Sequence, residues 1–224
     1  MLEEEAESKE LTGSEATRFR AVAARANYLA ADRPDMQYAV KEVCRRMARP
    51  VAGDWQKLSR LGRYLRSAPR CVLEYRWQVE GEAAVGYSDS DWAGDRKTGK
   101  STSGGIIMMG SHLIKSWSRT QDSITLSSAE AELVALSKLA MEILGVRSMC
   151  QEWRLVQKEV ASTLFADASA ALCIAKRQGA GKMRHISVKS LWLQEKSCKQ
   201  SCCITRSKAK IIQQMASLNM CGRS

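Results

Sequence analysis

Hydrophobic residues near the start of the chain recur at the spacing of an α-helix in three segments, which cover roughly residues 14–31, 34–49 and 54–67. A proline stands at an end of each segment, and the chain has no others: Pro34, Pro50 and Pro69. Prolines commonly begin or end helices, because they lack a backbone N–H and fix φ. The pattern therefore predicts a small helical unit.

From Cys71 to Ser118 the period of the pattern changes to two, which is typical of strands with one buried face. Clusters of Gly, Ser and Thr break this region into three runs, AAVGYSDSD, STSGGIIMMG and HLIKSWS. We expect three antiparallel strands connected as a meander.

A long helix is predicted next, between Ser127 and Trp153, because hydrophobic residues return to helical spacing and Ser127 and Glu130 match a capping box. The run STLFAD then indicates a short buried strand, and ASAALCIAKRQGAG a helix that ends at Gly179. The order of strand, strand, strand, helix, strand, helix predicts an α/β fold.

Three carboxylates occupy positions that local propensity does not explain. Asp89 and Asp167 each end an apolar strand, and sites in open α/β sheets commonly collect at such ends. Glu132 lies about 40° from the centre of the hydrophobic stripe of its helix, so it faces the sheet, whereas Glu130 lies outside the stripe and suits a cap. If the two strands are neighbours, Asp89, Glu132 and Asp167 meet at one edge. They would then form an oxygen-only site suited to Mg²⁺ and to phosphodiester cleavage with two metal ions.

Two of these three carboxylates, and the two aspartates that follow Asp89, also have simpler explanations. Asp167 could be the N-cap of the following helix, and Glu132 could be held in an ion pair. Asp91 and Asp95, close after Asp89, could form a turn. Spacing alone does not decide between these alternatives and a metal site.

Composition narrows the class of protein. Of the 224 residues, 45% are hydrophobic, enough for a substantial core, and no apolar run approaches the roughly 18 residues that cross a bilayer. The acidic start, MLEEEAESKE, is unlike a secretory signal. We expect an intracellular protein that is neither secreted nor associated with a membrane.

The net charge of +11 is concentrated at the end of the chain, because eleven Lys and Arg residues but only one acid, Glu195, follow Asp167. Such a block favours a polyanionic partner, with a solvated terminus as the alternative. The eight cysteines form no repeated CxxC framework, so we expect reduced thiols. A metal clip at Cys198, Cys202 and Cys203 is the alternative.

The stretch GYSDSDWAGDRKTGKSTSGGIIMMGSHLIKSWSRTQDSITLSSAEAELVALS resembles the ribonuclease H domain of copia-type LTR retrotransposon Pol polyproteins. The motifs SDWAGD, KSTSG, SWSRTQ, LSSAEAE, FADASAALCIAK and RHISVK follow the order and spacing of that family. Upstream, YLAADRPDMQYAV and LGRYLRSAP are similar to the segment that joins reverse transcriptase to ribonuclease H. The resemblance covers roughly residues 15–195.

This resemblance implies a ribonuclease H-like fold with a mixed five-stranded sheet and flanking helices. It implies cleavage of the RNA strand of RNA–DNA hybrids with Mg²⁺, for which Mn²⁺ can substitute, and a parent polyprotein that carries the reverse transcriptase. The family's first three carboxylates fall on Asp89, Glu132 and Asp167, and Asp91 and Asp95 fall in a turn of the family. Four basic residues are candidates for contacts with the nucleic-acid backbone, with ordinary surface charges as the alternative: Lys97, Lys100, Lys115 and Arg119.

The resemblance divides the chain into four parts: an acidic N-terminus (1–13), a helical connection segment (14–70), a ribonuclease H-like domain (71–196) and a basic, cysteine-containing tail (197–224). Family members carry a fourth carboxylate in a helix near the end, but no aspartate follows Asp167 here. Ser187 also stands at a position that is usually acidic in the family. The sequence therefore leaves open whether the chain is an active nuclease or an inactive nuclease fold that only binds nucleic acid.

Overall fold

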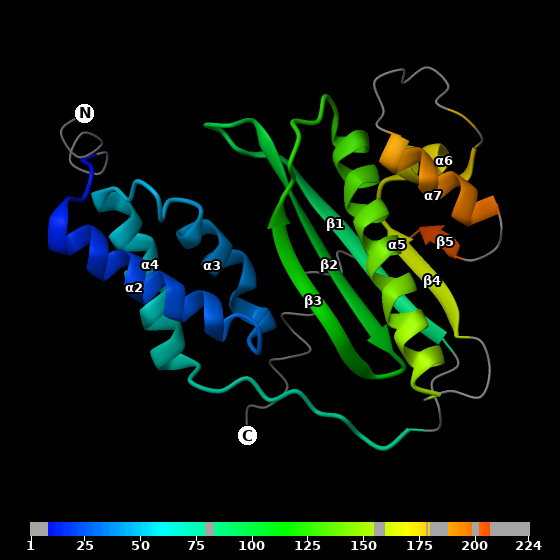
Figure 1. The fold of residues 1–224 in the computed structure, drawn as a ribbon, viewed down its shortest axis with the longest axis horizontal. Coiled ribbons are helices and arrows are strands. Elements are labelled where there is room, and N and C mark those ends of the chain that lie inside the picture. The colour runs from blue at the N-terminus through cyan, green and yellow to red at the C-terminus, as the bar shows by residue number, and fades with distance from the viewer. Residues whose placement is uncertain are drawn as a thin grey trace. The chain divides into compact units, whose positions relative to one another are not determined.

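The computed structural model describes residues 9–78, 83–154, 160–177, 179, 188–198 and 202–206. The chain divides after Val72 into two compact units, whose elements are labelled in Figure 1. The first eight residues of the predicted acidic N-terminus and residues 207–224 of the predicted tail lie outside the described residues. No helix in the described ranges is long and apolar enough to cross a membrane.

The first unit is helical, as the sequence predicts. Its elements are α2 (Gly13–Leu29), a 3₁₀ helix (Pro34–Met36), α3 (Gln37–Cys44) and α4 (Ala52–Ser67). They enclose a core that includes Phe19, Ala23, Met36, Val40, Val43, Leu58 and Leu61. The prediction of helix through residue 49 was too long, since α3 ends at Cys44. Beyond it, the carbonyls of Met47 and Ala48 accept hydrogen bonds from Arg20 of α2, at 2.9 and 3.2 Å.

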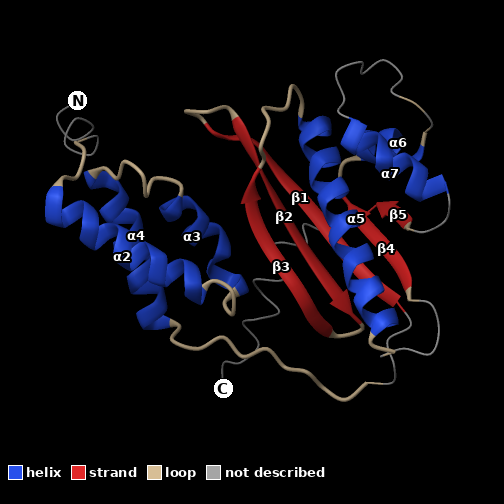
Figure 2. Ribbon diagram, in the orientation of Figure 1, coloured by secondary structure: helices blue, strands red, loops and turns tan. Residues whose placement is uncertain are grey.

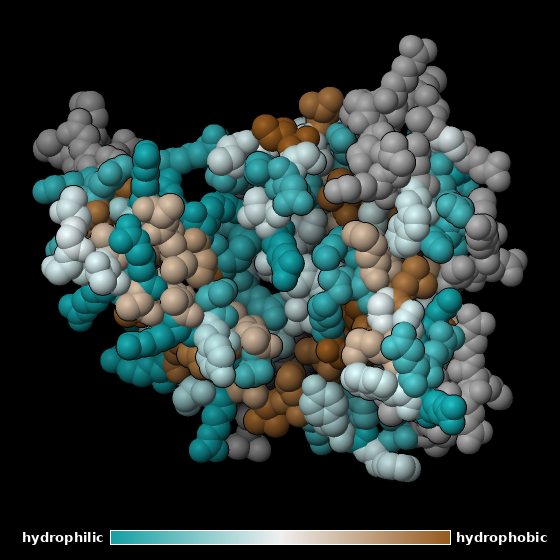
Figure 3. All heavy atoms as spheres, viewed as in Figure 1, coloured by the Kyte–Doolittle hydropathy of each residue, from teal (hydrophilic) through white to brown (hydrophobic). Residues whose placement is uncertain are grey.

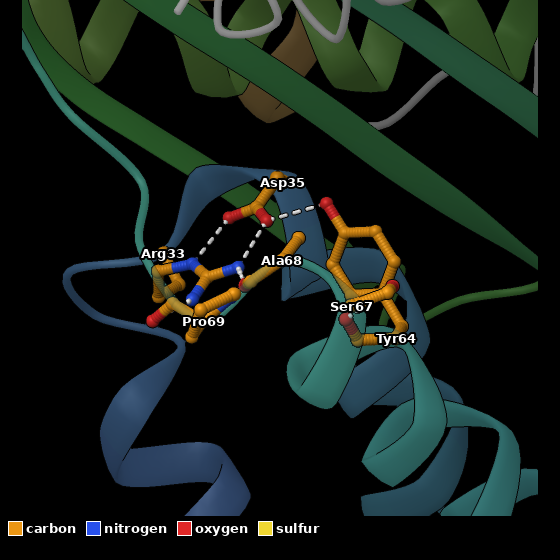
Figure 4. Close-up of polar contacts among 6 residues, drawn as sticks. All are labelled: Arg33, Asp35, Tyr64, Ser67, Ala68 and Pro69. Carbon is orange, nitrogen blue, oxygen red and sulfur yellow. Dashed lines mark hydrogen bonds and ion pairs between the residues drawn. The ribbon is translucent and has the colours of Figure 1, made fainter. Parts of the chain in front are cut away.

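A partly buried polar network connects two ends of this unit (Figure 4). The guanidinium of Arg33 donates to both carboxylate oxygens of Asp35, at 2.9 and 2.7 Å, and to the carbonyls of Ala68 and Pro69. The hydroxyl of Tyr64 on α4 donates to Asp35 at 2.7 Å. The network therefore ties the loop after α2 to the end of α4, and it satisfies carbonyls that the helix leaves open.

The second unit contains a five-stranded mixed sheet (Figure 2). Its strands are β1 (Ala83–Asp95), β2 (Lys100–Met109), β3 (His112–Thr120), β4 (Ala161–Ala166) and β5 (Cys203–Arg206), in the spatial order β3-β2-β1-β4-β5. The first three strands are antiparallel, whereas β4 runs parallel to β1 and β5 parallel to β4. This arrangement confirms the predicted meander and the mixed sheet, and β5 lies within the segment assigned to the basic tail.

Three helices, α5 (Ser128–Glu152), α6 (Ser169–Lys176) and α7 (Val188–Cys198), pack in one core with the sheet (Figure 1). That core includes Ile107, Leu136, Leu139, Ile143, Leu164, Leu172, Leu193 and Ile204. Helix α5 lies close to β1 at Gly86, where an added Cβ would lie 2.7 Å from a methyl group of Leu139. The helix that was expected to reach Gly179 ends earlier, at Lys176.

The start of α5 follows the predicted capping pattern with one difference. The Ser127 hydroxyl accepts from the backbone N–H of Glu130 at 3.2 Å, as in a capping box. The Glu130 carboxylate, however, accepts from the N–H of Leu126 at 2.7 Å instead of the N–H of Ser127. Glu130 is therefore a capping residue, as its position outside the hydrophobic stripe suggested.

Candidate active site

Strand pairing brings Asp89 and Asp167 to the same edge of the sheet. Tyr87 of β1 is paired with Phe165 of β4 in parallel register, and their rings stack with centroids 5.1 Å apart. Asp89 and Asp167 each come two residues later on these neighbouring parallel strands. Asp167 directly follows the end of β4, but the prediction that Asp89 ends its strand was wrong, because β1 continues to Asp95 through its pairing with β2. The pairing of β1 with β4 is the strand arrangement that the sequence analysis required for a shared site.

Glu132 completes the cluster from the second turn of α5. Only 6% of the residue is exposed, and its Oε1 accepts two hydrogen bonds from Ser90, from the backbone N at 3.0 Å and from the hydroxyl at 2.8 Å. The same Ser90 N–H lies 2.9 Å from Asp89 Oδ1. One oxygen from each of Asp89, Glu132 and Asp167 lies within 4.8 Å of the others. The structure therefore brings together all three predicted carboxylates.

Burial and neighbouring charge disfavour the charged forms of Asp89 and Glu132. Burial, and then the charge of Asp167, raises the pKa of Asp89. The pKa of Glu132 is raised to about 7: burial is the largest cause, hydrogen bonds from Ser90 oppose it, and the charges of Asp89 and Asp167 add to it. The Oε2 atom of Glu132 is buried without a hydrogen-bond partner. Three convergent carboxylates, and the unpaired Oε2 of Glu132, fit a hard divalent cation.

The simpler explanations for Glu132 and Asp167 do not match the geometry. Glu132 is held by Ser90 instead of by a cationic side chain. The N-cap of α6 is Ala168, so Asp167 is not at that position. Sequence reasoning did not single out Ser90, whose only signal was its place directly after Asp89.

Asp91 and Asp95 are structural, as the turn explanation expected. Between them the register of β1 against β2 shifts, which marks a bulge. Asp95 is buried and accepts from the Thr98 hydroxyl at 2.6 Å and from the Lys97 N–H at 3.2 Å. The Asp91 carboxylate occupies the space beside Gly94 that a Cβ there would need, 1.8 Å from its Oδ2. These contacts shape the turn that follows Asp89.

Three exposed hydrophobic residues, which we call the hydrophobic rim, lie on the end of β1 and the loop before α5 and were not predicted: Trp92, Ile124 and Leu126. Trp92 comes three residues after Asp89, and its indole N–H donates to the carbonyl of Thr125 at 3.2 Å. Trp92, Ile124 and Leu126 are 50%, 58% and 69% exposed. Hydrophobic side chains are visible at the surface above the loop between β3 and α5 (Figure 3). The rim therefore belongs to the two segments that also carry Asp89 and lead into the Glu132 helix.

The four basic candidates are placed differently. Lys97 and Lys100 lie at the β1–β2 turn. Lys115 forms an ion pair with Glu142 of α5, which joins the sheet to the helix. Arg119 is exposed on β3 and shares a cross-strand row with Ser103 and Ser90, about 10 Å from Ser90 at ordinary strand spacing. Arg119 is thus on the same face of the sheet as the residue that holds Glu132.

The chain is similar in sequence to several known proteins. The Pol polyprotein of transposon RE2 of Arabidopsis thaliana is 33% identical over 136 residues, which are 61% of this chain and 9% of that protein. The Pol polyprotein of transposon TNT 1-94 of Nicotiana tabacum is 29% identical over 164 residues, 73% of this chain and 12% of its own length. The secreted RxLR effector protein 161 of Plasmopara viticola is 37% identical over 110 residues, 49% of this chain and 77% of that protein. No family model matches the chain.

Solved structures overlap the chain at low TM-scores. A ribonuclease H1 isolated from compost aligns with a TM-score of 0.45 and 11% identity, over 62% of this chain and 92% of its own. A foamy viral protease–reverse transcriptase in complex with an RNA/DNA hybrid aligns with a TM-score of 0.40 and 15% identity, over 75% and 25% of the two chains. The fold assignment rests instead on strand order and direction within the chain itself.

The order β3-β2-β1-β4-β5, the helices on the sheet and the carboxylates at its edge define a ribonuclease H-like domain. Homologues of the chain include copia-type retrovirus-related Pol polyproteins. The chain spans 9% of the length of the RE2 and RE1 polyproteins.

Proposed function

We propose that the chain is the ribonuclease H part of a copia-type Pol polyprotein and hydrolyses the RNA strand of RNA–DNA hybrids. The observation that carries this proposal is the convergence of Asp89 on β1, Glu132 on α5 and Asp167 just after β4, with one oxygen of each within 4.8 Å of the others. Sequence similarity to retrovirus-related Pol polyproteins of transposons also supports the proposal. Backbone shape and 2′-hydroxyl groups would identify the hybrid, so we expect little base preference.

The three carboxylates would hold Mg²⁺, with Mn²⁺ as a substitute. A bound divalent ion lowers the pKa of water and stabilises charge that develops on a leaving oxygen. Glu132 is oriented for this role by the two hydrogen bonds from Ser90, which occupy Oε1 and leave Oε2 available. Asp167 is exposed, so the cluster opens to solvent, and to a substrate, on its side.

The missing fourth carboxylate would weaken binding of a second ion, because each carboxylate offsets part of a divalent charge. The only acid after Asp167 is Glu195, which is exposed on α7. We therefore propose a nuclease with reduced affinity for its second metal ion. The competing function is a nuclease fold that binds nucleic acid without cutting it, which the same deficit of acids favours.

Cleavage of an end-labelled RNA–DNA hybrid, with Mg²⁺ and then with Mn²⁺, tests the proposal. We expect Asp89→Asn to reduce the cleavage rate by at least about 100-fold, the order seen when a group that stabilises transition-state charge is removed. Asp91→Asn is the matched control, because Asp91 is an exposed carboxylate two residues away that shapes the turn. This control should cleave within about threefold of the unchanged chain, a margin that corresponds to less than 1 kcal/mol.

Two results would contradict the proposed nuclease activity. Equal cleavage by the unchanged chain and Asp89→Asn would place the chemistry elsewhere. Absence of cleavage by well-folded protein that still binds the hybrid would support the binding function instead. Calorimetric titration with Mg²⁺ separates loss of the metal from loss of the substrate, since Asp89→Asn should weaken binding of the ion in the absence of any hybrid.

A further inference from the structure

A basic pocket lies beside the carboxylate cluster, and none of the three carboxylates lines it. Its volume is about 520 Å³, within the range of ligand sites. It is lined by Ser169, Leu172, Cys173, Lys176, Arg177 and Arg206. Three of these six side chains are cationic and none is acidic, so the pocket suits an anion.

The fold explains why these residues meet. Residues 169, 172, 173 and 176 recur at helical spacing and share one side of α6. Arg206 ends β5 two residues after Ile204, which is buried in the core that the helices share, so both point to the helix side of the sheet. Arg206 at the end of β5 and one side of α6 thus line the pocket.

The pocket adjoins the candidate active site. Arg206 is paired with Ala166, the residue directly before Asp167. Ser169 comes two residues after Asp167 and begins α6. A polyanion that reaches Asp167 is therefore next to Arg206 and Ser169.

We propose that this pocket binds a phosphate of the nucleic-acid backbone, next to the phosphate that lies at the carboxylates. The inference rests on the proposed function, because it takes a nucleic acid as the ligand of the same edge. Three carboxylates repel a phosphodiester chain, and cations beside them offset that repulsion and set the strand's position. The Arg206 guanidinium matches a phosphate with paired N–H donors, and Leu172 offers an apolar wall to the sugar.

Binding of a labelled RNA–DNA hybrid in EDTA, without metal or cleavage, measures the contribution of Arg206. We expect Arg206→Gln to weaken binding about tenfold at moderate salt and to reduce the slope of log affinity against log salt by about one. The matched control is Arg154→Gln, an exposed arginine just beyond the end of α5, about 30 Å along that helix from Glu132. Equal effects of the two substitutions would overturn the proposal, because they would show a general charge effect.

Alkylation of Cys173 provides a second measurement of whether the pocket is occupied. Its thiol is free and exposed, as is that of Cys203 on β5, which does not line the pocket. Saturating hybrid should slow alkylation of Cys173 by N-ethylmaleimide at least about fivefold and leave Cys203 unchanged, since a backbone in the pocket covers only the first thiol. Peptide mass spectrometry separates the two sites. Equal alkylation of Cys173 with and without hybrid would overturn the proposal.

The two proposals fail in different ways. If the chain does not cleave hybrid, yet the hybrid protects Cys173 and Arg206→Gln weakens binding, the nuclease fails and the pocket stands. If the chain cleaves hybrid, but Cys173 is unprotected and Arg206→Gln binds like Arg154→Gln, the pocket fails and the nuclease stands.

Discussion

The charged form of Glu132 destabilises the fold because the side chain is buried, and the same position places its carboxylate in the candidate site. Folding raises its pKa from the ordinary value of 4.5 to about 7, with burial as the largest cause. Between these pH values the folded protein holds a proton that the unfolded chain has released. The contribution of protonated Glu132 to the stability of the folded protein is therefore fully present below about pH 4.5, and it is lost as pH rises through about 7.

The substitution Glu132→Gln tests this account. Without divalent ions at about pH 8, the variant should be more stable than the unchanged chain by up to about 3 kcal/mol, because the amide has no charge to bury. Near pH 4.5 the two should be similar, since Glu132 is then largely protonated. Urea unfolding across this range measures the difference. Parallel stability profiles would contradict the assigned cause, and added Mg²⁺ should stabilise only the chain that retains Glu132.

At the scale of the element, α5 connects local sequence to the site. Its first turn is held by the hydroxyl of Ser127 and the carboxylate of Glu130, and its second turn carries Glu132. Farther along, Leu136 and Leu139 are fully buried in the core of the second unit. The cap thus determines where the helix begins, and packing determines which side of it faces the sheet.

Ser127→Ala should lower the free energy of unfolding by about 1 kcal/mol, the usual cost of losing an N-cap hydroxyl. The matched control is Ser128→Ala, which changes the next, exposed serine, within the first turn of the helix. We expect the control to be within about 0.5 kcal/mol of the unchanged chain. Chemical denaturation of both variants measures the difference, and an equal loss in both would show that the cap contributes little.

At the scale of the whole molecule, two hydrophobic cores are separate. Leu58 belongs to the core of the helical unit, and Leu136 to the core between the sheet and its helices. Each unit contains the partners that bury its own hydrophobic residues, and this is the usual condition for a domain that unfolds as a unit.

Scanning calorimetry of matched leucine substitutions tests this division. Leu58→Ala and Leu136→Ala should each cost about 2–5 kcal/mol, the usual penalty for a buried Leu→Ala change. We expect each to lower the melting temperature of one transition and to leave the other within about 2 °C, a shift worth less than 1 kcal/mol. A single transition that both substitutions shift equally would contradict the division into two units.

The sequence by itself determined most of the elements, but neither α7 nor β5, and it identified the three carboxylates. Hydrophobic period, prolines and caps act locally, so the helices of the first unit, the meander and α5 could be predicted. Asp167 was identifiable because it ends an apolar strand, and Glu132 because it lies near the buried stripe of its helix. Asp89 was identified on the same grounds as Asp167, but β1 continues beyond it to Asp95. Predictions failed where a distant partner intervened, as at α3, where Arg20 binds the carbonyls of Met47 and Ala48.

Only the tertiary structure decided what depends on neighbours far apart in the chain. The strand β5 has four residues, too few to show a period, and its pairing with β4 gives it a place in the sheet. The same pairing brings Arg206 to α6 and forms the basic pocket. The raised pKa of Glu132 and its unpaired oxygen likewise arise from packing. Local pattern specifies which groups can point toward a site, whereas burial and convergence, which set their chemistry, exist only after the chain has folded.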